Sequence, residues 1–328
     1  MMVLVTGASG FLGSHAVRAL LDAGHDVRAS ARSADRVHRA LEPLGCSDMV
    51  EVVEGDVTDA DDVTRTLGGC DAVLHAAAVY SYAARRGREC LQANVRGAEC
   101  VLGQAVALGL DPIVHISSYV ALLPSNSTIT VGSPVGQPPT PYALSKARTE
   151  EIARRFQADG APVAIINPGM VWGPDDPGMG ESSLFARSVL AGQVPFGLPG
   201  AVPVVDVRDV AAAIVAAMRP GRGPSRHLAT GETVPMRQVQ TMVAEAGGTR
   251  PPRGTAPGWL LLGLGRTADW VQRVVPPRLP VSYQAPWTLT HGAPIDASAT
   301  ERDLNVTFRP AGDSIRDTVR WLLDAHQS

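Results

Sequence analysis

The first 170 residues alternate short β-branched runs with longer stretches in which apolar residues recur every three or four positions. Short runs of this kind predict strands, and the longer stretches predict amphipathic helices. The predicted strands are 2–6, 26–31, 50–54, 72–75, 112–117 and 162–166. The predicted helices are 11–23, 34–42, 59–67, 84–108 and 142–159. Strands separated by helices form right-handed βαβ units and a parallel sheet covered on both faces. The pattern therefore predicts an α/β fold with a doubly wound parallel sheet of the Rossmann type.

The regular alternation loosens after residue 170, where proline and glycine become frequent. We therefore predict a Rossmann domain over 1–170 and a smaller mixed C-terminal substrate lobe over 171–328. One βα unit near 203–218 is expected to return to the Rossmann domain. The long loop 121–141 is expected at the edge of a pocket between the two parts. The apolar segment 257–280 could be a lid helix, a dimer surface or part of the core of the small lobe.

The bulk composition excludes several classes of protein. A net charge of −3 and a pI near 6.2 give no overall electrostatic footprint for nucleic acid or an anionic membrane. The longest apolar run, Trp259 to Gly265, is far too short to span a bilayer. No two cysteines form a CxxC pair, so we expect buried, reduced thiols and neither a disulfide framework nor a metal site. The cysteines are Cys46, Cys70, Cys90 and Cys100. The chain opens directly into a strand, with no room for a signal peptide, and we expect a cytoplasmic protein that acts on a small molecule.

A glycine-rich turn follows the first predicted strand and opens the first predicted helix. It carries Gly7 for a tight turn, Gly10 for close approach of the backbone to a pyrophosphate, and Gly13 for packing of the helix on the sheet. The start of the helix offers free N–H groups and a positive dipole end to phosphates. The spacing alone is weak, but its place between strand and helix predicts a dinucleotide site. The residues expected to contact the dinucleotide here are Thr6, Gly7, Ser9, Gly10, Phe11, Leu12 and Gly13.

The end of the second strand distinguishes the two nicotinamide cofactors. An NAD site places an acid there for the ribose 2′-hydroxyl, whereas an NADP site uses arginine on the 2′-phosphate. Asp26 stands at the wrong end of this strand, while Arg32 and Arg36 follow its exit. These arginines could also be ordinary solvated side chains, but we favour NADP(H) over NAD(H).

The third strand is followed by Asp56 and Val57. A carboxylate and the next backbone amide could bind the amino group and a ring nitrogen of adenine. Asp56 could equally serve only as a turn or capping residue.

The only lysine of the chain stands four residues after a tyrosine, against 28 arginines elsewhere. Tyr142 and Lys146 share one face of a predicted helix. A neighbouring ammonium and the positive nicotinamide ring both favour the phenolate, so we expect the pKa of Tyr142 to fall from its usual value near 10. Tyr142 could then give a proton to a carbonyl oxygen, or take one in the reverse reaction. An ordinary surface lysine is the alternative.

Two serines at the end of the fifth strand could supply a hydroxyl partner. Alternation sends Ser117 and Ser118 to opposite faces, so only one can serve, and we choose Ser118. Asn94, on the long predicted helix before this strand, could hold a water that connects Lys146 to solvent. A polar contact without chemistry is the other interpretation of a mid-helix asparagine.

Together these residues resemble the extended short-chain dehydrogenase/reductase family. The matching motifs are Thr6-Gly-x-x-Gly-x-x-Gly13, Gly55-Asp56, His75-Ala-Ala-Ala78, Asn94-Val-x-Gly97, Ser117-Ser118, Tyr142-x-x-x-Lys146 and Asn167-Pro-Gly-x-Val-x-Gly-Pro174, with weaker matches as far as Ala211. The resemblance implies a catalytic triad of Ser118, Tyr142 and Lys146, assisted by Asn94, and supports Asp56 as an adenine contact. Further cofactor contacts that it implies are Ala76, Ala77, Pro168, Gly169 and Val171, beside Tyr142 and Lys146. The family habit also suggests a homodimer.

Within this family, the run Val27 to Arg32 looks like the dihydroflavonol reductase and 3β-hydroxysteroid dehydrogenase-like branch. One departure is Asn167, which stands before Pro168 where many relatives carry arginine. Direct transfer of substrate contacts from relatives is therefore in doubt.

The expected activity is NADPH-dependent reduction of a ketone or aldehyde on a hydrophobic small molecule, with Tyr142 as general acid. The substrate contacts we predict are Tyr80, Ser118, Met170 and Trp172, with Val79, Val171, Phe185 and Phe196 as further lining. Core packing is the commoner role of such side chains. One alternative is a nucleotide-sugar epimerase or dehydratase with tightly bound NAD, which the absent acid after the second strand disfavours. Another is a non-catalytic dinucleotide-sensing regulator, against which Tyr142 and Lys146 argue.

Overall fold

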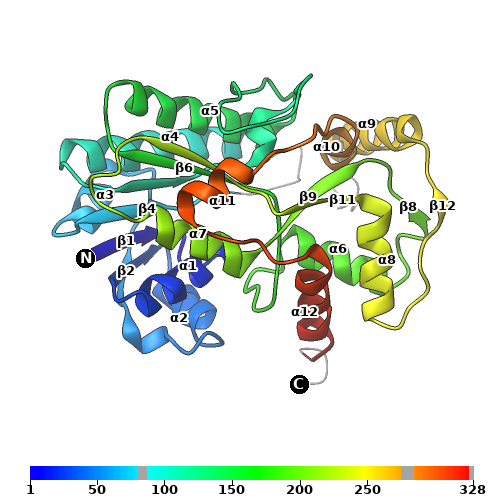
Figure 1. Ribbon diagram of the computed structural model, residues 1–328, viewed down its shortest axis with the longest axis horizontal. Coiled ribbons are helices and arrows are strands. Elements are labelled where there is room, and N and C mark those ends of the chain that lie inside the picture. Colours follow the sequence, from blue (N-terminus) through cyan, green and yellow to red (C-terminus); the bar gives the residue numbers. More distant parts are fainter. Residues whose placement is uncertain (80–86, 275–283, 325–328) are drawn as a thin grey trace.

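A seven-stranded parallel sheet forms the centre of the larger part of the molecule (Figure 1). The structure is a computed structural model that describes residues 1–79, 87–274 and 284–324. The strand order is β10-β6-β5-β4-β1-β2-β3. Its strands are β1 (Met2–Thr6), β2 (Asp26–Ala31), β3 (Glu51–Glu54), β4 (Ala72–His75), β5 (Ile113–Ile116), β6 (Val163–Pro168) and β10 (Ser225–Ala229). The chain winds outward from β1 in both directions, so the predicted doubly wound α/β fold is confirmed.

Helices cover both faces of this sheet, because its strands are apolar on both sides. Val3 and Val5 of β1 join a core cluster with α1, α2 and α7, while Leu4 joins the opposite cluster with α3, α4 and α5. The helices are α1 (Phe11–Asp22), α2 (Ala34–Leu41), α3 (Ala60–Leu67), α4 (Gly87–Ala107), α5 (Pro141–Ala158) and α7 (Val207–Ala217). The six predicted strands and five predicted helices are confirmed with small shifts at their ends, apart from residues 84–86, which lie outside the described residues.

Local sequence signals set several of these boundaries. Asp59 caps α3, since its Oδ1 accepts hydrogen bonds from the backbone N–H groups of Asp61 at 3.0 Å and Asp62 at 3.1 Å. Helix α5 begins at Pro141, whose fixed φ suits a first helical position. Short 3₁₀ helices, η1 (Ser47–Met49) and η3 (Tyr119–Leu122), follow α2 and β5. The side chain that caps η3 is Ser118.

A smaller part of the molecule is built on a three-stranded mixed sheet of order β11-β9-β7. Strand β7 runs parallel to β9, and β11 runs antiparallel to it. The strands here are β7 (Met170–Trp172), β8 (Phe196–Gly197), β9 (Ala201–Asp206), β11 (Glu232–Pro235) and β12 (Arg253–Thr255). The helices are α6 (Glu181–Leu190), α8 (Met236–Ala246), α9 (Gly258–Val274), α10 (Gln284–Thr290), α11 (Ser298–Leu304) and α12 (Ala311–Asp324). A third core cluster, centred on Trp172, lies between this sheet and helices α6, α8 and α12.

The βα unit expected near 203–218 corresponds to β9 and α7, which lie in different layers. Helix α7 packs against α1 in the larger part, whereas β9 pairs within the small sheet. The strand that completes the large sheet beyond β6 is β10, which the sequence pattern did not predict. Its first residues, Ser225 and Arg226, are polar, so the strand lacks an apolar run. The division at residue 170 stays a prediction.

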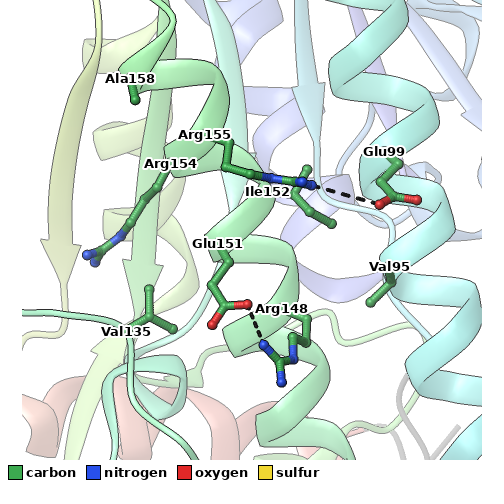
Figure 2. Close-up of a pocket in the computed structure, with 9 residues that line it drawn as sticks. All are labelled: Val95, Glu99, Val135, Arg148, Glu151, Ile152, Arg154, Arg155 and Ala158. Atoms are coloured by element: carbon green, nitrogen blue, oxygen red, sulfur yellow. Dashed lines mark hydrogen bonds and ion pairs between the residues drawn. The ribbon is translucent and has the colours of Figure 1, made fainter.

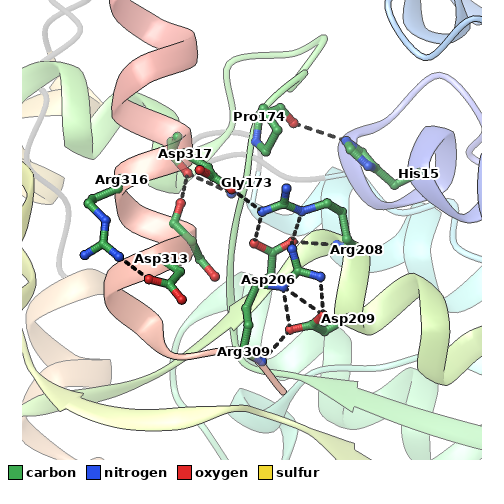
Figure 3. Close-up of polar contacts among 12 residues, drawn as sticks. His15, Gly173, Pro174, Asp206, Arg208, Asp209, Arg309, Asp313, Arg316 and Asp317 are labelled. Atoms are coloured by element: carbon green, nitrogen blue, oxygen red, sulfur yellow. Dashed lines mark hydrogen bonds and ion pairs between the residues drawn. The ribbon is translucent and has the colours of Figure 1, made fainter. Parts of the chain in front are cut away.

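An ionic network joins β9 and α7 to the C-terminal helix (Figure 3). The buried carboxylate of Asp206 accepts hydrogen bonds from the backbone and guanidinium of Arg208, and the same guanidinium reaches Asp317 of α12 at 2.6 Å. Burial raises the pKa of Asp206, but the Arg208 hydrogen bonds outweigh it and hold that pKa below its usual range. Arg309 pairs with Asp209 at 2.7 Å. These contacts fix the smaller part against the larger one.

All four cysteines are free thiols in the structure. Cys46 and Cys90 are buried, whereas Cys70 and Cys100 are only half-buried. Within the described ranges, none of the helices combines the length and apolar character needed to cross a membrane.

Candidate active site

The glycine turn after β1 has the close backbone packing that its spacing predicts. Gly7 has φ +76°, in the left-handed region. A Cβ on Gly13 would lie 2.1 Å from the carbonyl oxygen of Gly7, so the first turn of α1 can approach the loop only with glycine there. Thr6 connects the glycine turn to the end of β4, because its Oγ1 is 2.9 Å from Nδ1 of His75 and accepts a hydrogen bond from the N–H of Ala77 at 3.3 Å.

A cleft of about 470 Å³ opens above this turn, at the carboxyl ends of β1, β2, β3 and β4. Ten predicted site residues line it: Gly7, Ser9, Gly10, Arg32, Arg36, Asp56, Val57, Ala76, Ala77 and Asn94. Phe11, Leu12 and Gly13 form the first turn of α1 beside it. The structure therefore brings most of the predicted cofactor contacts into one cleft.

Two exposed arginines occupy the end of the cleft next to β2. Arg32 follows β2 and Arg36 lies in the first turns of α2, and both line the cleft. Asp26 lies at the opposite end of β2, where it is paired in register with Met2. The structure thus places two arginines at this edge of the cleft. Strand β2 itself ends without an acid, whereas Glu54 at the end of the neighbouring β3 accepts a hydrogen bond from the N–H of Ala34 at 2.9 Å.

Asp56 makes the turn contacts that were one of its two predicted roles. Its Oδ1 accepts from the N–H and the hydroxyl of Thr58, at 2.9 and 2.8 Å. The backbone N–H of Asp56 donates to Asp62 at 3.0 Å. Asp56 and Val57 nevertheless line the cleft, and Gly97 of α4 packs closely on Val57. The turn role therefore leaves an adenine contact open.

Ser118 and Tyr142 meet at the carboxyl end of β5. Ser118 is buried, and its Oγ accepts from the N–H of Val120 at 3.5 Å. Burial raises the pKa of Tyr142 to about 12, and a hydrogen bond with Ser118 opposes this only in part. Lys146 alone does not give the expected lowering of this pKa, because loss of solvent around the phenol outweighs any attraction to the nearby cation. Tyr142 is therefore a protonated phenol at neutral pH.

Lys146 is buried one helical turn after Tyr142 on α5, against the end of β5. Its side chain is 7% exposed and its Nζ donates to the carbonyl oxygen of Ile116 at 3.0 Å. Burial lowers the pKa of Lys146 to about 8, while the charge of Glu150 acts in the opposite direction. The lysine is thus no ordinary surface residue, and its ammonium form dominates at neutral pH.

Glu150 is the centre of a polar network that the sequence interpretation missed. Its buried carboxylate accepts from the hydroxyl of Ser117 at 2.6 Å and from Nδ2 of Asn167 at 2.6 Å. Its other oxygen accepts from Nε of Arg154 at 3.0 Å. Asn167 also donates to the carbonyl oxygen of Ser118 at 3.1 Å. The network therefore holds the backbone of Ser118 and the helix face that carries Lys146.

The spacing could have revealed Glu150. Tyr142, Lys146 and Glu150 stand four residues apart in sequence, so they share one face of α5. The same contacts explain the unusual Asn167, which reaches both Ser118 and Glu150 from the end of β6. Ser117, the serine not chosen for chemistry, also belongs to this network.

Asn94 of α4 connects the segment after β4 to α5 through hydrogen bonds. Its Oδ1 accepts from the N–H of Val79 at 2.7 Å. Its Nδ2 donates to the carbonyl oxygen of Val79 and to Oγ of Ser145, each at 3.0 Å. Ser145 in turn donates to the carbonyl oxygen of Tyr142 at 2.8 Å. Both amide hydrogens are engaged, which favours a positioning role.

The predicted substrate contacts lie in several places. Met170 is half-buried in β7, whereas Trp172 is fully buried in the core of the smaller part. Pro168 and Gly169 mark the exit from β6, where the N–H of Gly169 donates to the carbonyl oxygen of Ala229 at 3.0 Å. Tyr80 lies outside the described residues. The substrate contacts stay predictions.

The loop between β7 and α6 reaches the cofactor cleft, which the sequence interpretation did not foresee. Gly178 lines the cleft, and the loop is held by the carboxylate of Asp176, which accepts from the N–H of Gly180 at 2.6 Å and from the hydroxyl of Ser183 at 2.7 Å. His15 of α1 is 3.1 Å from the carbonyl oxygen of Pro174, through its Nε2 (Figure 3). The loop is therefore tied to the first helix of the Rossmann fold.

Two stacked histidines lie within the sheet behind the site. His75 and His115 are in register on β4 and β5, with ring centroids 5.5 Å apart. Burial lowers the pKa of His75 to about 3 and that of His115 well below its usual value. Neither ring nitrogen of His115 has a hydrogen-bond partner among the described residues.

A second hollow lies on the outer surface of α4 and α5, and it contains none of the predicted site residues (Figure 2). Arg148 pairs with Glu151 along α5 at 2.7 Å, and Arg155 of α5 reaches Glu99 of α4 at 3.9 Å. These four side chains are exposed. We therefore assign the chemistry to the cleft at the strand ends.

Comparison with known proteins gives a consistent result. The sequence model of the NAD dependent epimerase/dehydratase family matches residues 3–229. Sterol demethylase protein B of Methylococcus capsulatus is 33% identical over 98% of each chain. A putative dihydroflavonol 4-reductase of Synechocystis is 27% identical, over 97% of this chain and 93% of that protein.

The fold agrees with solved structures as well. The dTDP-glucose 4,6-dehydratase DesIV of Streptomyces venezuelae superposes with a TM-score of 0.77 at 24% identity, over 100% of this chain and 98% of that one. At this level of identity the similarity concerns the fold.

Proposed function

The chain belongs to the NAD dependent epimerase/dehydratase family, and from this premise we propose that it is an NADPH-dependent reductase of a ketone or aldehyde on a lipophilic small molecule. The predicted family and the predicted NAD(P)-dependent enzyme class are both confirmed. The cofactor preference, the substrate class and the roles of individual residues are the proposal.

The cleft suits a dinucleotide. Gly7, Gly10 and the N-terminus of α1 would hold the pyrophosphate, because backbone N–H groups at a helix N-terminus bind phosphate. A side chain at Gly7 would clash with the backbone, since its Cβ would lie 2.7 Å from the backbone nitrogen of Ala77. Arg32 and Arg36 would hold a 2′-phosphate at the β2 edge, and Asp56 with Val57 would hold the adenine. Bound there, NADPH would supply the hydride for carbonyl reduction. The arginines and the missing acid at the end of β2 favour NADP(H) over NAD(H).

The observation that carries the proposed role of Tyr142 is its position: the phenol is hydrogen-bonded to Ser118 at the carboxyl end of β5, and Lys146 stands one helical turn away on α5. From this position the protonated phenol can give its proton to a carbonyl oxygen. Ser118, hydrogen-bonded to Tyr142, would orient that oxygen. The positive charge of Lys146 stabilises negative charge that develops on the phenol oxygen.

The lipophilic substrate is supported by the side chains around Tyr142. Tyr142 packs against an apolar cluster that includes Tyr119, Val120, Leu228 and Trp287. A relative over the full length of the chain is named for a sterol. An apolar surround of this kind binds an apolar carbonyl compound better than a charged nucleotide sugar.

The first experiment is a pair of fluorescence titrations of the purified protein with NADPH and with NADH. We expect clearly tighter binding of NADPH. Arg32→Ala should weaken NADPH binding about ten- to hundred-fold, the value of a charge-assisted hydrogen bond, and leave NADH binding nearly unchanged. Arg39→Ala is the matched control, because Arg39 is exposed on the same helix, α2, but does not line the cleft. Equal losses for both cofactors would place the phosphate elsewhere.

The second experiment measures turnover with a panel of lipophilic ketones and aldehydes. Tyr142→Phe should reduce kcat by at least about a hundred-fold, the contribution of a general acid, while NADPH binding stays intact. Tyr119→Phe is the control, because Tyr119 is a buried tyrosine of the same apolar cluster. Near-normal turnover of Tyr142→Phe would remove Tyr142 from the mechanism. NAD that co-purifies and resists dialysis would instead support a nucleotide-sugar epimerase.

A further inference from the structure

One end of the smaller part carries large apolar side chains that are exposed. Trp259 is 74% exposed and Leu260 is 40% exposed, both in the first turn of α9, and Phe196 of β8 is 57% exposed. Strand β8 pairs with β12, which leads into α9, and the N–H of Ala256 donates to the carbonyl oxygen of Gly197 at 2.8 Å. These elements share the end of the molecule farthest from the N-terminus, on the right in Figure 1. Trp259 is the most exposed large apolar side chain in the described part of the chain.

The same end is positively charged although the whole chain is acidic. Three arginines and no acidic residue fall between Arg250 and Arg266, whereas the net charge of the chain is −3. Arg250 and Arg253 are exposed; Arg253 is the first residue of β12, and Arg250 lies three residues before it. Arg237, near the start of α8, is also exposed, and its side chain passes close to Gly197 of β8. Exposed apolar side chains beside arginines form the pattern of a surface that enters the headgroup region of an anionic bilayer.

The inner side of α9 faces the candidate active site. Leu262 packs against the apolar cluster of Tyr119, Val120, Leu228 and Trp287, and Tyr142 packs against the same cluster. Helix α9 therefore has one side over the cluster that surrounds Tyr142 and another side, with Trp259 and Leu260, at the surface.

We propose that this surface, formed by Phe196, Arg250, Arg253, Trp259 and Leu260, docks on the headgroup region of an anionic phospholipid bilayer. Trp259, Leu260 and Phe196 enter the interface, and the arginines contact the phosphates. Docking depends only on this surface. Delivery of a lipophilic substrate from the bilayer to Tyr142 is a consequence that also rests on the proposed reductase function.

The charges distinguish a bilayer from a second copy of the chain. A two-fold symmetric contact through this surface would bring the arginines of one copy near the same arginines of the other, and like charges in an interface are unfavourable. Anionic headgroups remove this repulsion.

The test is sedimentation of the full-length protein with vesicles, without substrate or cofactor. We expect binding to vesicles of phosphatidylcholine and phosphatidylglycerol, weaker binding to phosphatidylcholine alone, and release by salt. The double variant Arg250→Glu and Arg253→Glu should lower the partition coefficient at least about thirty-fold, from roughly one kcal/mol for each arginine lost near an anionic surface. The double variant Trp259→Ser and Leu260→Ser should lower it by about tenfold or more.

Matched controls carry the same substitutions on other surfaces. Met49→Ser with Leu108→Ser replaces apolar side chains that are 56% and 49% exposed on the Rossmann domain. Arg39→Glu with Arg219→Glu replaces two exposed arginines elsewhere. Both controls should bind vesicles like the original protein, apart from a small general charge effect in the second.

Three outcomes would overturn the proposal. One is no binding to anionic vesicles, and another is binding that falls equally in the α9 variants and the controls. The third is a dimer in analytical ultracentrifugation that Trp259→Ser dissociates, because a second copy would then cover this surface. Vesicle binding together with failure of every ketone and aldehyde would leave docking in place and refute only the reductase function.

Discussion

Replacing Glu150 by glutamine tests the buried network that supports the candidate active site. The Glu150 carboxylate accepts from Ser117, from Asn167 and from Arg154, and its side chain is fully buried. Glutamine keeps the shape but turns one acceptor oxygen into an amide donor. The Ser117 hydroxyl can rotate to accept from that amide. Asn167 cannot adapt without giving up its bond to the carbonyl oxygen of Ser118, and Arg154 has no acceptor to offer.

The expected loss of stability follows from these contacts. Removal of one partner from a buried ion pair typically costs about 3–5 kcal/mol. Arg154 remains 20% exposed and still donates to the carbonyl oxygen of Ser133, so its charge stays partly solvated. We therefore expect a decrease of about 3 kcal/mol in the free energy of unfolding, which a protein with a stability of about 5–15 kcal/mol survives folded.

The same variant should change the pH dependence of the reaction. Burial lowers the pKa of Lys146 to about 8, and the Glu150 charge raises it. Without that charge the pKa falls further, so the ammonium form is lost at a lower pH as the pH rises. The alkaline limb of the profile of kcat/KM against pH should therefore move to lower pH in Glu150→Gln.

Glu151→Gln is the matched control. Glu151 is the next residue on α5 and pairs with Arg148, but its side chain is 42% exposed. Urea unfolding and the pH profile should both remain close to those of the original protein. A Glu150→Gln variant that loses stability but keeps its alkaline limb would show that Glu150 is structural only. A variant unchanged in both measurements would refute the network itself.

Two further substitutions test single features of the site and the sheet. Lys146→Arg should abolish turnover although it keeps a positive charge, because a planar guanidinium cannot take the buried position in which Nζ donates to the carbonyl oxygen of Ile116. An arginine variant that is active in the reductase assay would contradict this argument. His115→Leu should raise the free energy of unfolding by about 1–3 kcal/mol at neutral pH, since it removes two buried ring nitrogens that have no hydrogen-bond partner among the described residues. The folded-state pKa of His115 lies well below its usual 6.5, so only the unfolded chain gains a proton at this residue as the pH falls below 6.5, and the free energy of unfolding decreases. In urea unfolding between pH 7 and about pH 5, His115→Leu should lose part of this decrease. If the free energy of unfolding of the variant falls with pH as steeply as that of the original protein, His115 does not cause the acid sensitivity.

Features coded within a few residues were visible in the sequence. The glycine spacing from Thr6 to Gly13, between a strand and a helix, determines the backbone conformation of this turn. Tyr142 and Lys146 depend on helix spacing alone, and the cap at Asp59 on a local hydrogen bond. These features required no knowledge of distant parts of the chain.

Features that depend on distant contacts were not visible. Asn167 and Ser117 reach Glu150 across 17 and 33 positions of sequence. The pKa of Tyr142 rises because the surrounding fold excludes water, and spacing to Lys146 says nothing about that exclusion. Strand β10 is recognisable only through its pairing with β6, since its own sequence has no strong apolar pattern.

The path of the chain limits how a new substrate range could be acquired by recombination. The elements around the small sheet come from separate stretches, because α7 and β10 return to the large sheet between β9 and β11, and α12 arrives only after α11 has packed against α7 and β10. A single crossover near residue 170 would therefore exchange α7 and β10 of the large fold together with the small sheet. By contrast, the stretch from Gly173 to Gly200 leaves and re-enters the small sheet at adjacent strands, β7 and β9, and includes the Gly178 loop and α6. Exchange of this one segment would replace α6 and the loop that brings Gly178 to the cleft, while every strand of the large sheet would stay in place.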